Sequence, residues 1–208
     1  MKKIDIKEHR KKIIFAISFL LFIILTFTIF NKSINRIDTY IENIILNIRK
    51  DNLTNIMIII TNISSAYALT VITILLFVII KNKKIPLSIF KNLIFVFLLS
   101  QLTKVILQRE RPLGIDLIDA TGFSYPSGHS MISMAYFGFI SYLIYKKINH
   151  KIAKIFLILI LFIIIFLIGF SRIYLGVHYL SDVIGGFLLS IAYLMIYINL
   201  NKNKEVIK

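Results

Sequence analysis

Long stretches without a charged side chain constrain this chain more than any other feature of its sequence. Ile13–Phe30 is 18 residues without a charge, Ile56–Ile80 is also uncharged, and Ile155–Phe170 has no polar side chain at all. A helix of about 20 apolar residues spans the hydrocarbon core of a bilayer. Hydrophobic residues make up 58% of the chain, more than the roughly one half that is typical of a soluble domain. The sequence therefore predicts an all-α integral membrane protein.

Six spans are expected, and the length leaves room for a single domain over residues 1–208. The first span is interpreted as a helix that stays in the membrane, because no small-x-small cleavage site follows it in Asn31–Ile34. The expected six-helix bundle has spans at about residues 13–30, 56–80, 86–107, 129–145, 155–170 and 179–200.

Asn31–Asn52, between the first two spans, has a different pattern. Apolar side chains recur there at helical spacing, whereas the charged residues, Asp38 among them, fall elsewhere. This pattern predicts an amphipathic helix that either lies in the membrane interface or packs on the helix bundle. The recurring apolar residues are Ile34, Ile37, Ile41, Ile44, Ile45 and Ile48.

Basic residues are distributed unevenly between the connections. If the spans alternate in direction, the side that holds the two termini carries 16 Lys and Arg and the opposite side carries seven. By the positive-inside rule, both termini are expected in the cytoplasm. The net charge of +15 is therefore read as a topology signal, and no nucleic-acid partner is expected. Membrane lipids are the expected surroundings, and the oligomeric state stays open.

Polar residues gather where the same alternation places the extracytoplasmic ends of the helices. Lys104 and Arg111 follow the third span, Ser127–His129 open the fourth, and Ser171–Asp182 joins the fifth to the sixth. Ionisable groups at a membrane edge are costly, so their presence indicates a functional site.

The first of these groups has helical spacing. Lys104, Gln108 and Arg111 fall at i, i+4 and i+7, which predicts one stripe on a helix that continues to Pro112. Arg109 and Glu110 lie off this stripe and are expected to be solvated.

The residues from Ser127 to Asp182 suggest phosphoryl chemistry. Asp182 lies four residues after His178, a spacing that lets a carboxylate fix the tautomer of an imidazole. Arg172 offers a planar guanidinium to phosphate oxygens, and the turn at Gly128 offers backbone N–H groups at a helix start. This set suits phosphate transfer to an imidazole nucleophile, with His129 protonating the leaving oxygen.

At these residues the sequence resembles the type 2 phosphatidic acid phosphatase superfamily of lipid phosphate phosphatases. The resemblance is close from Lys104 to Asp182 and extends to the rest of the chain by topology only. Tyr125 stands where Phe is common, and Leu113-Gly114 follows the first motif. The matching motifs are Lys104-x6-Arg111-Pro112, Pro126-Ser127-Gly128-His129 and Ser171-Arg172-x5-His178-x3-Asp182.

The resemblance implies a mechanism through a phosphohistidine, without a metal or another cofactor. His178 would be the nucleophile, Asp182 would orient it, and His129 would act first as the acid and then as the base. The implied phosphate-binding residues are Lys104, Arg111, Ser127, Gly128 and Arg172.

The expected function is hydrolysis of a lipid phosphate at the outer leaflet of a bacterial cell membrane. Undecaprenyl diphosphate and phosphatidylglycerophosphate are the favoured substrates, and phosphatidic acid is a third. Lipid phosphotransfer by the same site is an alternative. An anion transporter is disfavoured because the fifth span has no polar side chain. Glu110, Asp116 and Asp119 could suggest a metal site, but a loop role is favoured.

Overall fold

The computed structural model describes residues 6–201, which form eight α-helices. No β-strand occurs within residues 6–201, so the prediction of an all-α fold is confirmed. The helices are α1 (Ile6–Phe30), α2 (Asn35–Ile48), α3 (Asp51–Asn62), α4 (Ala66–Ile79), α5 (Lys84–Leu107), α6 (Gly128–Lys147), α7 (Lys151–Tyr174) and α8 (Leu180–Leu200).

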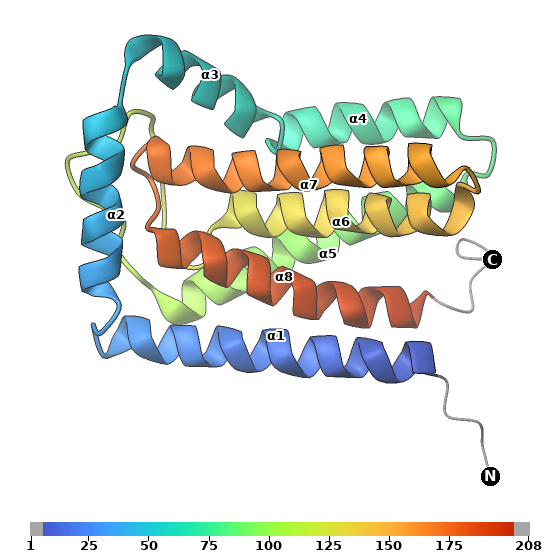
Figure 1. Cartoon of the computed structure of the whole chain (residues 1–208), viewed down its shortest axis with the longest axis horizontal. Helices are drawn as coiled ribbons and strands as arrows, with labels where there is room; N and C mark the ends of the chain where they lie inside the picture. The colour runs from blue at the N-terminus through green and yellow to red at the C-terminus, as the bar shows by residue number, and fades with distance from the viewer. Residues whose placement is uncertain (1–5, 202–208) are drawn as a thin grey trace.

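The centre of the bundle is α6, which packs against α5, α7 and α8, while α1 packs against α8 (Figure 1). Tyr136 and Phe139 of α6 are completely buried. On the outside of the bundle, Phe27 of α1 is 69% exposed and Phe166 of α7 is 67% exposed. A large apolar surface of this kind is stable only against lipid or another apolar partner.

Four of the described helices, α1, α5, α7 and α8, are long and apolar enough to cross a membrane. Together, α3 and α4 pass the same test as a fifth span that is bent by 51°. The predicted fourth span lies in α6, where Ser and Tyr are mixed with the apolar residues, and α6 is not among the described helices that pass. The membrane fold is thus confirmed, whereas the count of six spans stays a prediction.

The segment predicted as one span at 56–80 is broken near its middle. α3 ends at Asn62 and α4 begins at Ala66, with the side chain of Ser65 accepting a hydrogen bond from the N–H of Ala68 at 3.2 Å. Ser and Asn compete with the helical backbone for hydrogen bonds and favour caps, which explains why the helix stops here. The break redirects the chain just after Thr61.

The predicted amphipathic helix is α2, which lies across one end of the bundle (Figure 1). It packs on α7 and α8 and buries Ile45, yet Ile37 and Tyr40 stay exposed. Packing on the bundle, one of the two predicted arrangements, is therefore observed. Contact of the exposed apolar side chains with the membrane interface stays a prediction.

Candidate active site

The predicted helical stripe from Lys104 to Arg111 is wrong. α5 ends at Leu107, and Gln108 adopts a left-handed conformation with φ of 45°. The chain then leaves the helix axis, so Arg111 reaches the site from the loop of residues 108–127 instead of from a helix face. This loop is tied down by backbone hydrogen bonds from Ser124 to Arg109 (2.7 Å) and from Leu117 to Leu175 (2.9 Å).

His178 lies in the short turn between α7 and α8 and is buried. Its Nδ1 is 3.3 Å from Oδ2 of Asp182, and its Nε2 is 3.2 Å from Nη1 of Arg111. Because a guanidinium only donates hydrogen bonds, the partners assign the proton to Nδ1 and leave a lone pair on Nε2. This is the tautomer that a nucleophilic imidazole needs.

The protonation state of His178 follows from its surroundings. Burial lowers the pKa of His178 to about 3, although the hydrogen bond and the charge of Asp182 oppose the shift. The charges of Arg172 and Lys104 lower it further. The imidazole is therefore neutral at physiological pH when no anion occupies the site.

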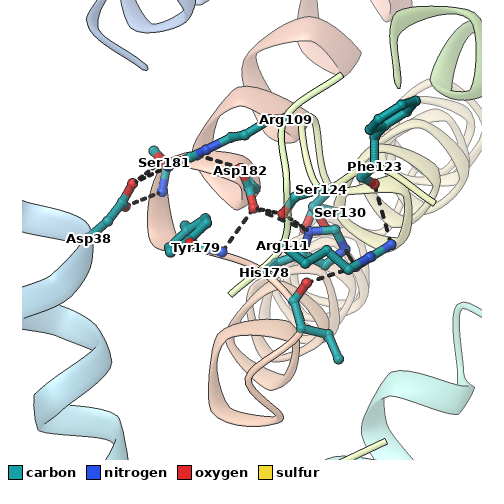
Figure 2. Close-up of polar contacts among 12 residues, drawn as sticks. Asp38, Arg109, Arg111, Phe123, Ser124, Ser130, His178, Tyr179, Ser181 and Asp182 are labelled. Carbon is teal, nitrogen blue, oxygen red and sulfur yellow. Dashed lines mark hydrogen bonds and ion pairs between the residues drawn. The ribbon is translucent and has the colours of Figure 1, made fainter. Parts of the chain in front are cut away.

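Asp182, in the first turn of α8, is completely buried and surrounded by donors (Figure 2). Its Oδ2 accepts hydrogen bonds from the N–H of Tyr179 at 2.9 Å and from the hydroxyl of Ser124, in addition to its contact with His178. The other oxygen, Oδ1, pairs with Nη1 of Arg109 at 2.6 Å. The carboxylate thus has a fixed orientation toward the imidazole.

Three predicted phosphate ligands reach the site from three different elements. Lys104 on α5 donates to the carbonyl of Phe123 at 2.7 Å, and Arg111 donates to the carbonyl of Val177 at 2.7 Å. Arg172 on α7 donates from Nη1 to Thr61 at 2.7 Å, while its buried Nε has no partner among the described residues. Lys104 and Arg111 are thus held by backbone carbonyls, whereas Arg172 is held by a hydroxyl of α3.

The start of α6 supplies the remaining predicted ligands. Ser127 occupies the N-cap position, but its side chain makes no capping hydrogen bond and instead accepts one from Ser130 at 3.0 Å. A Cβ atom at Gly128 would lie 3.2 Å from the hydroxyl of Ser100, so a larger residue there would require that hydroxyl to shift. His129 follows in the first turn of α6 and is partly buried.

Comparison with known proteins decides the family. The family model described as the PAP2 superfamily matches residues 85–205. The chain belongs to the PAP2 superfamily. Phosphatidylglycerophosphatase B of Bacillus subtilis is 33% identical over 180 residues, which cover 83% of this chain and 87% of that protein. The resemblance inferred from the three motifs is thus confirmed.

Solved structures support the same assignment. The crystal structure of a transmembrane PAP2-type phosphatidylglycerolphosphate phosphatase from Bacillus subtilis matches with a TM-score of 0.84 and 27% identity, covering 93% of this chain and 98% of that one. The structure of LpxE from Aquifex aeolicus matches in fold, with a TM-score of 0.63, 24% identity and coverage of 77% and 94%. The protein is a membrane lipid phosphatase of the PAP2 type.

In this PAP2 phosphatase, the expectation that Arg109 is solvated is wrong. Its side chain is only 12% exposed and pairs with Asp182 at 2.6 Å and with Asp38 at 2.8 Å. Its guanidinium also lies 4.2 Å from the centre of the Tyr179 ring. The sequence does not reveal this pairing, because it depends on where α5 ends and on Asp38 of α2, which lies 71 residues before Arg109.

Several further polar residues of the site were not identified from the sequence. The expectation that Asp38 falls outside the apolar pattern is wrong, because its spacing of four, three and seven residues from Ile34, Ile41 and Ile45 puts it on the same helix face, and its side chain is buried. Thr61, Ser100 and Ser124 carry no comparable signal. They matter only because the fold brings them to Arg172, Gly128 and Asp182.

Glu110, Asp116 and Asp119 of the 108–127 loop are all exposed. Within residues 6–201, no group of three His, Cys, Asp or Glu side chains is close enough to hold a metal ion. The predicted loop role of Asp116 and Asp119 agrees with their exposure.

Proposed function

We propose that this PAP2 phosphatase hydrolyses phosphatidylglycerophosphate through a phosphohistidine on His178. The observation that carries the proposal is the pair of contacts at this imidazole, with Asp182 at Nδ1 and Arg111 at Nε2. A neutral ring with its lone pair beside a phosphate-binding cation is arranged to attack phosphorus.

In the proposed first step, the lipid phosphate binds among Lys104, Arg111 and Arg172, and the N–H groups at the start of α6 donate hydrogen bonds to its remaining oxygens. Nε2 of His178 attacks phosphorus, a P–N bond forms, and the P–O bond to the lipid breaks. His129 gives its proton to the leaving alkoxide. The bound phosphate supplies the negative charge that allows His129 to carry a proton among these cations.

In the second step, His129 takes a proton from water as the water oxygen attacks the phosphohistidine. The P–N bond breaks, inorganic phosphate leaves, and His178 returns to its neutral state. Asp182 stabilises the imidazolium character that develops on His178 in both steps. No step requires a metal, because the developing charge faces Lys104, Arg111 and Arg172.

The substrate assignment rests on similarity. The curated relative at 33% identity is named phosphatidylglycerophosphatase B, which supports phosphatidylglycerophosphate as the first choice. Undecaprenyl diphosphate and phosphatidic acid present the same terminal phosphate to the site. Transfer of the phosphoryl group to a lipid or sugar hydroxyl instead of water uses the same intermediate.

A panel of lipid phosphates tests the proposal. Detergent-purified protein should release inorganic phosphate fastest from phosphatidylglycerophosphate, with and without EDTA, and vanadate should inhibit by mimicking pentacoordinate phosphorus. His178→Gln is the inactive control. Activity that disappears in EDTA and returns with Mg²⁺ would refute the metal-independent mechanism, and faster release from undecaprenyl diphosphate would change the substrate.

We also propose that the site faces outside and that both termini are cytoplasmic. The support is that the site lies at the α2 end of the bundle, while the basic turns at Lys81–Lys84 and Lys147–Lys151 lie at the other end (Figure 1). The chain has no cysteine, so labelling has no background.

Single cysteines test this orientation. Leu113→Cys, in a side chain that is 85% exposed on the site loop, should react with an impermeant thiol reagent in intact cells. Asn82→Cys should react only after the cells are opened. Gly122 is a poorer position because its φ of +71° strains any side chain. The reverse labelling pattern would place the site in the cytoplasm.

A further inference from the structure

We propose that Asp38 and Arg109 are positioning residues that hold Asp182, and through it His178, in the reactive geometry. Arg109 occupies one of the unspecified positions of the Lys104-x6-Arg111-Pro112 motif, and Asp38 lies outside all three motifs, so neither was assigned as a ligand or a catalyst. The inference rests on the proposed role of His178 as the nucleophile.

Arg109 joins two buried carboxylates that come from distant parts of the chain. Its Nη1 lies 2.6 Å from Oδ1 of Asp182, and its Nη2 lies 2.8 Å from Oδ2 of Asp38. The Asp38 side chain is 2% exposed and that of Asp182 is fully buried. Two buried anions share one guanidinium, so removal of Arg109 would leave two carboxylates without their common cation.

Asp38 also contacts the start of α8, directly after the turn of residues 175–179 that carries His178 and is called the nucleophile turn below (Figure 2). Its Oδ1 accepts a hydrogen bond from the backbone N–H of Ser181 at 3.0 Å, and its Oδ2 accepts one from the Ser181 hydroxyl at 2.5 Å. Ser181 is in the first turn of α8, directly before Asp182. A side chain of α2 therefore caps the helix that carries the orienting carboxylate.

The C-terminal end of α2 contacts Tyr174, the residue directly before the nucleophile turn. Arg49, at the C-terminal end of α2, donates from Nε to the carbonyl of Tyr174 at 3.0 Å. The N–H of Lys50 donates to the Tyr174 hydroxyl at 3.0 Å. Residues 175–179, which include His178, are thus bounded on both sides by contacts with α2 or its end.

The nucleophile turn packs tightly against Arg49 at Gly176. Gly176 has a φ of +75°, and a Cβ atom there would lie 2.6 Å from Nη2 of Arg49 and 2.2 Å from the carbonyl oxygen of Ile115. No side chain fits between the turn and Arg49. The position of α2 and the position of the nucleophile turn therefore cannot change independently.

The two oxygens of Asp182 have separate tasks. Oδ2 contacts His178, whereas Oδ1 contacts Arg109. The contacts of the Arg109 guanidinium are carboxylates, the Ser181 hydroxyl and the ring of Tyr179, so it faces the back of the carboxylate and not the phosphate site. Loss of Arg109 or Asp38 should accordingly slow the chemical step without weakening substrate binding.

The decisive variant is Asp38→Asn, which keeps an oxygen for the N–H of Ser181 but removes the charge. We expect kcat to fall about tenfold or more, as for the loss of a hydrogen bond to a charged group, with KM within about twofold of the original value. Phosphoenzyme formation should slow by the same factor as kcat. Arg36→Gln, on the exposed outer face of the same helix, is the matched control and should leave both parameters unchanged.

Variants of Arg109 test the same network from its central residue. Arg109→Gln should lower kcat, Arg109→Lys should restore part of the loss, and the double variant with Asp38→Asn should lose less than the product of the two single effects, because both changes break one network. If Arg109→Gln does not fold, as judged by its thermal unfolding in detergent, then Asp38→Asn and Arg109→Lys decide the outcome.

Three results would overturn the proposal. One is an unchanged kcat in folded Asp38→Asn. Another is a raised KM with an unchanged kcat in an Arg109 variant, which would make Arg109 a substrate ligand. The third is independence of the two variants in the double-mutant cycle. Trapping of phosphohistidine on His178 in the unaltered protein is measured in parallel. Its absence there would refute the proposed function itself and not the network.

Discussion

Nη1 of Arg111 lies 3.2 Å from Nε2 of His178. A proposed phosphate ligand thus contacts the lone pair of the proposed nucleophile. The same nitrogen also donates to the carbonyl of Val177 at 2.7 Å. We expect a bound phosphate to offer Arg111 a stronger, charged acceptor and so to release this lone pair for attack on phosphorus.

Arg111→Ala should therefore weaken substrate binding as well as slow the reaction. Loss of one hydrogen bond to a charged group corresponds to about 1.5–3 kcal/mol, or a decrease in kcat/KM of roughly 10- to 150-fold. Initial-rate kinetics with phosphatidylglycerophosphate measure this decrease in kcat/KM. Arg36→Ala, exposed on α2, is the control with the same change of charge. Equal losses in the two variants would mean that Arg111 acts only through the overall charge of the surface.

Asp182→Asn should leave the fold near its original stability but cost several orders of magnitude in kcat. An amide can donate to Nδ1 and so favours the tautomer with the proton on Nε2, as in the corresponding change of hydrolase triads. The same substitution leaves Arg109 facing a neutral group. Single-turnover kinetics should show slow formation of the phosphoenzyme. A variant that forms phosphoenzyme at the original rate would exclude an orienting role for Asp182.

His178 should remain neutral between about pH 5 and pH 8 in the substrate-free protein, because burial lowers its pKa to about 3. In the unfolded chain the same group takes up a proton below about pH 6.5. The unfolded state then binds more protons than the folded state, so this group destabilises the fold progressively as the pH falls from about 6.5 toward 3. NMR of protein labelled with ¹⁵N-histidine measures the ring directly. A titration of His178 near its ordinary pKa of 6.5 would contradict the burial seen here.

His129→Ala should slow the reaction according to the leaving group. Without the proton donor, a lipid alkoxide leaves poorly, whereas p-nitrophenolate needs little protonation, so the loss should be smaller with p-nitrophenyl phosphate. The second step still lacks its base, and phosphohistidine should accumulate. Acid quench followed by mass spectrometry locates the phosphate. Its presence on any residue other than His178 would show that the proposed roles are wrong.

The sequence by itself determined the membrane fold and the family. Runs such as Ile155–Phe170 have one stable environment, because a backbone in hydrocarbon must satisfy its hydrogen bonds within a helix. His178 and Asp182 are in contact in the structure, because His178 lies directly before the N-cap residue of α8 and Asp182 lies in the first turn of that helix. Spacing in the sequence is informative where only a few residues separate the two partners.

Only the tertiary structure decided which distant residues contact the three arginines of the site. The end of α5 at Leu107 changed the path of Arg111, and the break after Thr61 brought a hydroxyl to Arg172. Arg109 was expected in solvent but lies between Asp38 and Asp182. These contacts join residues that are about 70 to more than 100 positions apart. Periodicity reports only which face of a helix is apolar, whereas the partner of a buried charge depends on where the chain returns after several membrane crossings.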